Sequence, residues 1–143
     1  MYPIDIFVQS YFSGVRTPVL TNIMYSLTTV FDASYNFILI VLCFTVLIYL
    51  VRSKRYSLLF FITLFLGEGV DYFLKNFFDI ARPLDGFITV IGNSFPSYHA
   101  TSATIFFVML MYIFDYKLTS FWRIVFNTAC TLGILVVAFS RVY

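Results

Sequence analysis

The chain has 143 residues, of which 61% are hydrophobic and only 11% are charged, and its formal net charge is +2. This composition is far too apolar for an ordinary water-soluble domain and predicts an integral membrane protein. The small and scattered positive charge argues against a nucleic-acid-binding surface. The two cysteines, Cys43 and Cys130, lie in separate apolar runs and form neither a disulfide framework nor a zinc motif.

The first 31 residues form an amphipathic segment rather than a clean hydrophobic span. Apolar residues such as Ile4, Phe7 and Tyr11 recur at helical spacing, with polar residues on the other side. Arg16 and Pro18 stand in the middle of the segment and favour a break there. We expect one or two short helices lying in the membrane interface, with a crossing helix packed within the bundle as the alternative.

Four hydrophobic runs follow, over residues 35–51, 56–74, 101–114 and 124–139. We interpret each run as the apolar part of a transmembrane helix. The expected fold class is therefore all-α, a polytopic membrane helical bundle with about four transmembrane helices after an N-terminal amphipathic interfacial helix. We expect residues 1–143 to form a single membrane-embedded domain.

Basic residues mark one side of this bundle. They stand at positions 52, 54 and 55 after the first run and at positions 117 and 123 around the later short turn. By the positive-inside tendency, these turns face the cytoplasm. Counting crossings from there places a second polar set together on the extracytoplasmic side of the plasma membrane: Lys75, Arg82, Ser97, His99 and Arg141.

Three members of this second set supply positive charge, namely Lys75, Arg82 and Arg141. A phosphate monoester carries close to two negative charges near neutral pH, and its transfer needs fixed donors around the phosphoryl oxygens. The positive-inside tendency disfavours cations on the extracytoplasmic side. Three cations gathered on that side therefore indicate an anionic ligand. Phosphate is the ligand that this set fits.

The segment SFPSYHAT, at residues 94–101, supplies the other groups that phosphate chemistry needs. Pro96 is suited to opening a helix, whose first free N–H groups form an anion site. The Ser97 hydroxyl and the Tyr98 amide would then donate to phosphoryl oxygens. His99, the only histidine, is the natural general acid because an imidazole has an ordinary pKa of about 6.5.

Taken singly, these residues also have structural interpretations. Lys75 alone is typical of an interfacial lysine that snorkels at a helix end or pairs with Asp71 or Asp79 at helical spacing. Glu68 and Asp71 are intramembrane carboxylates, for which structural pairing is favoured over a proton path. We therefore leave both carboxylates out of the candidate site. The conjunction of the other residues favours a functional interpretation.

The ordered motifs resemble the type-2 phosphatidic acid phosphatase family, whose pattern is KxxxxxxRP, then PSGH, then SRxxxxxHxxxD. Residues 75–83 match the first motif completely, and Pro96, Ser97 and His99 match the second. Ser140 and Arg141 match the start of the third. Tyr98 stands where the family pattern has Gly. The resemblance covers about residues 35–143, and the amphipathic N-terminal helix is also similar to that of bacterial members.

The resemblance implies a membrane enzyme that hydrolyses phosphatidic acid, phosphatidylglycerol phosphate or a polyprenyl pyrophosphate. It implies a metal-independent double displacement with no cofactor. A histidine attacks phosphorus, His99 protonates the lipid alkoxide, and water then cleaves the phosphohistidine. The implied catalytic residues in this sequence are His99 and Arg141, and the implied phosphate-binding residues are Lys75, Arg82, Ser97 and Tyr98. The expected partners are membrane lipids and the lipid phosphate substrate.

The sequence stops at Tyr143, before the position at which the family places its nucleophilic histidine. We therefore expect a C-terminally incomplete member that lacks at least one further span and is inactive alone. A non-catalytic binder or transporter of anionic lipid phosphates, using the same cations without a nucleophile, is the alternative. The sequence leaves the oligomeric state open.

Overall fold

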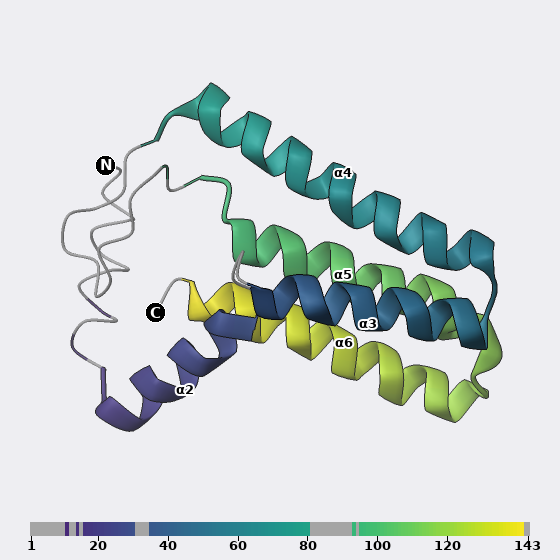
Figure 1. Ribbon diagram of the computed structural model, residues 1–143. Coiled ribbons are helices and arrows are strands. Elements are labelled where there is room, and N and C mark those ends of the chain that lie inside the picture. The colour runs from purple at the N-terminus through teal and green to yellow at the C-terminus, as the bar shows by residue number, and fades with distance from the viewer. Residues whose placement is uncertain are drawn as a thin grey trace.

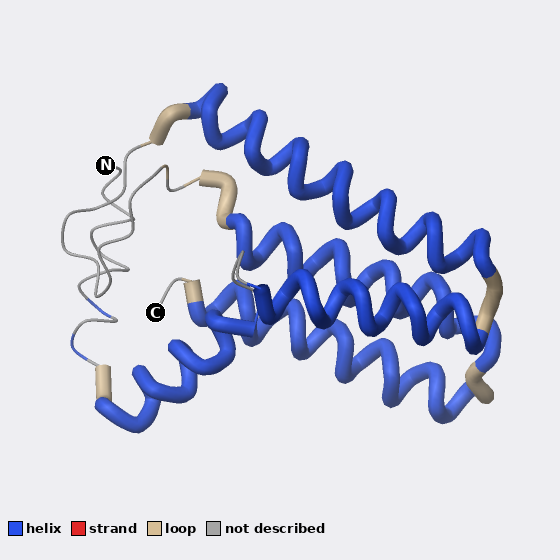
Figure 2. The backbone as a smooth tube through the Cα atoms, viewed as in Figure 1, coloured by secondary structure: helices blue, strands red, loops and turns tan. Residues whose placement is uncertain are grey.

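The computed structural model describes residues 11, 14, 16–30, 35–80, 93 and 95–141. Within these residues the chain is helical and contains no strand (Figure 2). The elements, in chain order, are α2 (Pro18–Val30), α3 (Tyr35–Val51), α4 (Lys54–Phe78), α5 (Tyr98–Phe114), a short 3₁₀ turn η1 (Asp115–Lys117) and α6 (Ser120–Ser140) (Figure 1). The predicted all-α fold class is confirmed.

Each of the four hydrophobic runs lies within one helix, and α3 has the predicted bounds. The amphipathic N-terminal segment is described mainly through α2, which begins at Pro18 as the expected break requires. A proline fits this first helical position because its missing N–H would have no partner there. The Thr17 side chain supports the same start, since its Oγ1 accepts a hydrogen bond from Leu20 N at 3.3 Å. Most of the predicted amphipathic segment before residue 16 lies outside the described residues.

Helices α3 to α6 run alternately in opposite directions and form two hairpins (Figure 1). Residues 52–53 connect α3 to α4, and residues 115–119 connect α5 to α6, both at the same end of the bundle. Helix α5 packs against both α4 and α6, so it joins the two hairpins. The opposite end therefore gathers the C-terminal ends of α4 and α6 with the N-terminal end of α5.

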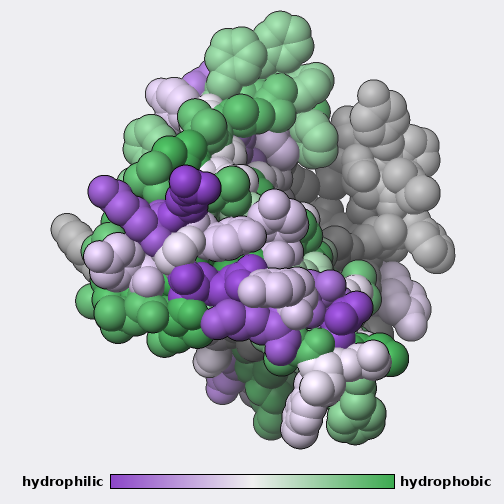
Figure 3. Space-filling model, turned by 90° about the vertical axis from the view of Figure 1, so that its right-hand side faces the viewer, coloured by the Kyte–Doolittle hydropathy of each residue, from purple (hydrophilic) through white to green (hydrophobic). Residues whose placement is uncertain are grey.

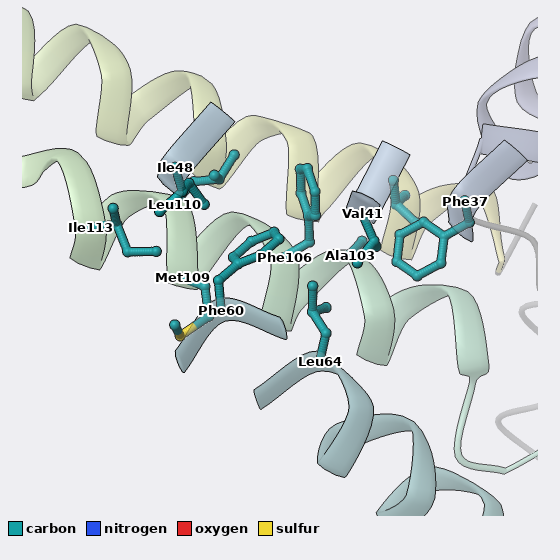
Figure 4. Packing of buried hydrophobic residues seen from close by; sticks show 11 residues of the cluster. Phe37, Val41, Ile48, Phe60, Leu64, Ala103, Phe106, Met109, Leu110 and Ile113 are labelled. Atoms are coloured by element: carbon teal, nitrogen blue, oxygen red, sulfur yellow. The ribbon is translucent and has the colours of Figure 1, made fainter. Parts of the chain in front are cut away.

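The core lies between α3, α4 and α5, and Phe106 of α5 stands near its centre (Figure 4). The Phe106 ring lies 6.4 and 5.0 Å from the rings of Phe37 and Phe44 on α3, measured between centroids. It lies 5.7 Å from the ring of Phe60 on α4, which is fully buried. The contacts with Phe44 and Phe60 are edge-to-face, an arrangement that is specific in geometry, and the Phe37 ring is tilted. They fix α5 against the first hairpin.

The outer faces of the helices carry large apolar side chains. Leu50 on α3, Phe65 on α4 and Ile124 on α6 are 74%, 70% and 67% exposed. Such a surface suits lipid rather than water. Among the described residues, Lys54–Phe78 and Ser120–Ser140 are long and apolar enough to cross a membrane, and Asn36–Val51 is apolar but shorter. The predicted number of about four spans stays a prediction.

The end with the two turns gathers basic residues. The Arg52 guanidinium lies between two tyrosine rings, 4.5 Å from the centroid of Tyr56 and 4.1 Å from that of Tyr116. Lys117 Nζ donates to the carbonyl of Val51 at the end of α3, at 2.9 Å. A cation at this position complements the carbonyl groups of a helix C-terminus. Figure 3 looks onto this end and shows hydrophilic residues gathered between hydrophobic ones.

Small residues let the helices approach closely, as is common in membrane bundles. A Cβ atom added at Gly133 on α6 would lie 2.7 Å from Cζ of Phe107 on α5. At Gly69 on α4, which faces outward, nothing lies within 4 Å of such an atom. The backbone of α6 therefore touches an α5 ring directly at Gly133.

We expect Gly133→Leu to destabilise the protein while Gly69→Leu does not. Both changes raise helix propensity similarly, so the difference isolates the clash with Phe107. Overpacking of this kind costs about 1–3 kcal/mol. The measurement is the midpoint of thermal unfolding in detergent. Equal midpoints for the two variants would contradict the close approach of α5 and α6.

Candidate active site

Helix α5 begins at Tyr98, two residues after Pro96, which the sequence had predicted to open the helix. Ser97 is the N-cap residue, with extended backbone angles (φ −82°, ψ 110°), and its side chain makes no capping hydrogen bond. The first helical bond runs from Thr101 N to the Ser97 carbonyl at 2.9 Å. The amides of residues 98–100 precede that bond, so they lie at the helix start, where N–H groups and the helix dipole favour an anion.

His99 lies in this first turn and is half-buried. Its ring meets the Tyr98 ring edge-on, with centroids 5.9 Å apart and planes at 87°. The predicted general acid therefore stands beside the predicted amide donors, as their sequence neighbourhood requires.

Lys75 lies in the last turn of α4 and brings a second segment to the start of α5. Its Nζ lies 5.3 Å from the centroid of the Tyr98 ring, within the range of a cation–π contact. The same Nζ lies 3.1 Å from Asp71 Oδ2, one turn back on α4. The predicted pairing of Lys75 with Asp71 is confirmed.

Two carboxylates of α4 face hydroxyl groups of α5. Asp71 is 1% exposed, and its Oδ1 accepts a hydrogen bond from Thr101 Oγ1 at 3.0 Å. Glu68 Oε1 accepts one from Ser102 Oγ at 2.5 Å, and the Tyr98 phenol lies beside the same carboxylate. Buried charges are tolerated only with such partners. The sequence favoured structural pairing for both carboxylates, and in the structure both are paired.

The remaining predicted residues stand as follows. Arg141 directly follows α6, and the end of α6 lies at the same end of the bundle as the end of α4 and the start of α5 (Figure 1). Arg82 lies outside the described residues. The structure thus brings Lys75 and Tyr98 into contact, with Ser97 and His99 adjacent in the chain. The joint role of these residues in catalysis stays a prediction.

Sequence reasoning missed Thr101 and Ser102 as partners of the two carboxylates. The signal was present as spacing. Glu68, Asp71 and Lys75 recur at intervals of three and four residues, which places them on one stripe of a helix. Tyr98, Thr101 and Ser102 form a matching stripe. The sequence does not say that these two stripes face each other; this follows only from the packing of α4 against α5.

Comparison with known proteins places this arrangement in a family. Residues 56–143 match the model of the PAP2 superfamily. The chain belongs to the PAP2 superfamily. The predicted resemblance to the type-2 phosphatidic acid phosphatases is thereby confirmed, because PAP2 denotes that group.

A solved structure supports the fold of this PAP2 chain. The crystal structure of a transmembrane PAP2-type phosphatidylglycerolphosphate phosphatase from Bacillus subtilis is similar, with a TM-score of 0.86. The match covers 98% of this chain and 71% of that chain, at 20% sequence identity. No curated protein matches the sequence. The transmembrane PAP2 fold and the apolar outer faces of the helices together identify a membrane protein.

The residue at which this PAP2 chain departs from the family pattern has defined surroundings. Tyr98 occupies the Gly position, and its ring extends toward α4, over Lys75 and beside Glu68. Its amide stays at the start of α5.

We expect Ser102→Ala to destabilise the protein more than Thr131→Ala. Ser102 is fully buried and donates to Glu68, whereas the exposed Thr131 hydroxyl bonds only to the Asn127 carbonyl in its own helix. Removing the donor leaves a carboxylate oxygen without its hydrogen bond, which costs about 1–3 kcal/mol. Thermal unfolding in detergent measures the difference. Equal losses would show that the hydroxyl of Ser102 does not support the carboxylate.

Proposed function

We propose that this PAP2 protein is a membrane lipid phosphate phosphatase. One observation supports this proposal most directly: the Lys75 ammonium lies against Tyr98 at the helix start where the α5 amides and His99 stand. A cation, uncapped amides and an imidazole at one helix end are the groups that phosphoryl transfer requires. The alternative, a binder or transporter of lipid phosphates, would use the same groups without hydrolysis.

In the proposed reaction, Lys75 and Arg82 attract the phosphate, and the Ser97 hydroxyl and the Tyr98 amide donate to its oxygens. A histidine that the family pattern places beyond Arg141 attacks phosphorus, and the bond from phosphorus to the lipid oxygen breaks. His99 gives its proton to the departing alkoxide. Water then attacks the phosphohistidine and releases phosphate, while Arg141 stabilises the charge on the phosphoryl oxygens. No metal or cofactor takes part in this scheme.

The proposed substrates are phosphatidic acid, phosphatidylglycerol phosphate and polyprenyl pyrophosphate. The protein from Bacillus subtilis with the similar fold is named a phosphatidylglycerolphosphate phosphatase. Phosphatidylglycerol phosphate is therefore the first substrate to test.

We also propose that α3 to α6 cross the plasma membrane as four spans, with the two turns in the cytoplasm and the phosphate site on the extracytoplasmic side. Helices α3 and α5 have 17 residues each, which is about 26 Å of helix and at the lower limit for a span. The basic residues of the turn end support this orientation.

We expect His99→Ala, Ser97→Ala and Arg82→Ala each to abolish phosphate release by the full-length protein without preventing membrane insertion. Loss of the general acid alone should lower the rate by about 10²- to 10⁴-fold. Phosphate release from phosphatidylglycerol phosphate in detergent micelles measures the effect. The exposed Lys54 at the opposite end provides a control variant, Lys54→Ala, which should keep the wild-type rate.

Two further outcomes test the reaction scheme in the same assay. Vanadate, which mimics pentavalent phosphorus, should inhibit, and a chelator should leave the rate unchanged. Wild-type turnover by His99→Ala would remove its role, and strict dependence on Mg²⁺ would count against the mechanism. Saturable binding of the lipid by the wild-type protein, with no hydrolysis, would favour the binder or transporter.

We expect single cysteines at positions 95 and 119 to lie on opposite sides of the membrane. Phe95 precedes α5 and Thr119 precedes α6, and both side chains are exposed. In a background without Cys43 and Cys130, a membrane-impermeant maleimide added to intact cells should label Phe95→Cys and not Thr119→Cys. Thr119→Cys should become reactive when the cells are opened. Labelling of both variants in intact cells would contradict the topology.

A further inference from the structure

Asp71 is buried deeply and uses both oxygens of its carboxylate. Its side chain is 1% exposed, with Oδ2 at 3.1 Å from Lys75 Nζ and Oδ1 accepting the hydrogen bond from Thr101. The first contact stays within α4, whereas the second crosses to α5. Asp71 therefore ties the ammonium group to a fixed point between the two helices.

Contacts hold two parts of Lys75, its main-chain carbonyl and its side-chain ammonium. Asn93 Nδ2 donates to its carbonyl at 2.8 Å, which fixes the main chain. The ammonium contacts both Asp71 and the Tyr98 ring, and the Lys75 side chain is only 21% exposed. Neither Asp71 nor this use of the Tyr98 ring belongs to the motif pattern KxxxxxxRP and PSGH.

An untethered lysine at this place would behave differently. Lysine side chains near the ends of membrane helices extend toward the polar interface, and the four-carbon stem is highly flexible. Lys75 lies in the last turn of α4, so extension toward the interface would carry its ammonium away from Asp71, which lies one turn deeper in the helix. The buried carboxylate one turn back opposes that movement because it attracts the ammonium toward the bundle interior.

We propose that Asp71 is a positioning residue that holds the Lys75 ammonium at the start of α5, with the Tyr98 ring as its second support. Asp71 acts through Lys75 and does not touch the substrate. This inference rests on the lipid phosphate phosphatase function proposed above and adds to it a residue outside the motifs. In the resting protein the carboxylate keeps the cation against the Tyr98 ring in the first turn of α5, so that an arriving phosphate meets it already in place.

The kinetic test is a double-mutant cycle between Asp71 and Lys75 in the full-length protein. Asp71→Asn keeps the shape and an acceptor for Thr101 but removes the charge. It should lower kcat/KM for phosphatidylglycerol phosphate by about tenfold, within the range for contacting residues. The same change in a Lys75→Met background should cause no further loss. Asp71→Glu, which retains the charge, should recover part of the activity.

Thr101→Val separates positioning from a purely structural role. It removes the cross-helix hydrogen bond of Asp71 and leaves the ion pair with Lys75 intact. If Asp71 only joined the two helices, Thr101→Val would reduce activity as much as Asp71→Asn does, and losses from Asp71→Asn and Lys75→Met would add. Either result would overturn the proposal. Thermal unfolding shows whether each variant is folded, and Asp71→Ser, which also removes the charge, is used if Asp71→Asn is not folded.

A second measurement needs no hydrolysis. The protein is treated with an amine-acetylating reagent, and mass spectrometry follows modification of Lys75, with the exposed Lys54 as internal control. Asp71→Asn should speed the modification of Lys75 several-fold because the amine loses its tether, while Lys54 is unchanged. An unchanged Lys75 rate would overturn the positioning role. A wild-type protein that releases no phosphate would instead overturn the proposed function, so the two failures are distinguishable.

Discussion

The contact between α4 and α5 depends on one constraint, which is that two carboxylates inside an apolar bundle must have partners. Glu68 and Asp71 find those partners in Ser102 and Thr101. With the contact between Lys75 and Tyr98, the pairs run in opposite order along the two helices, as antiparallel neighbours require. The aromatic contacts of Phe106 hold α5 against the first hairpin, and pairing of the carboxylates adds a second requirement on the offset between α4 and α5. The polar pairs select one register, and that register places Lys75 beside the start of α5.

The helices were predictable because each apolar run is bounded by polar residues, by proline or by a basic turn. The bounds of α3 followed from the sequence, whereas α4 continues to Phe78, beyond the predicted limit at residue 74. Lys75 marked the end of the predicted run, yet the helix continues past it because its ammonium has a partner within the structure, the buried carboxylate of Asp71. Polarity marks the end of a span only where the polar group faces the membrane boundary.

Some features of the candidate site could be predicted from the sequence and others could not. A helix start near Pro96 and the ion pair between Asp71 and Lys75 are local features that the sequence predicted, and the observed helix begins two residues after Pro96, at Tyr98. The cross-helix hydrogen bonds of Thr101 and Ser102 were not predictable, because they require the register of α4 against α5. Tyr98 is a similar case. A bulky residue at a Gly position suggests an obstruction, but its ring leaves the helix start sideways and packs against α4.

The two short turns have a mechanical consequence. They tie the hairpins at one end only, and the aromatic contacts of Phe106 hold α5 to the first hairpin partway along its length. At the opposite end of the bundle, Asp71 bonds to Thr101 and Lys75 contacts the Tyr98 ring, so polar side chains join the end of α4 to the start of α5. The two ends of the bundle are therefore held by different means, by the chain itself within each hairpin at the turn end and by polar side chains between the hairpins at the end that carries His99.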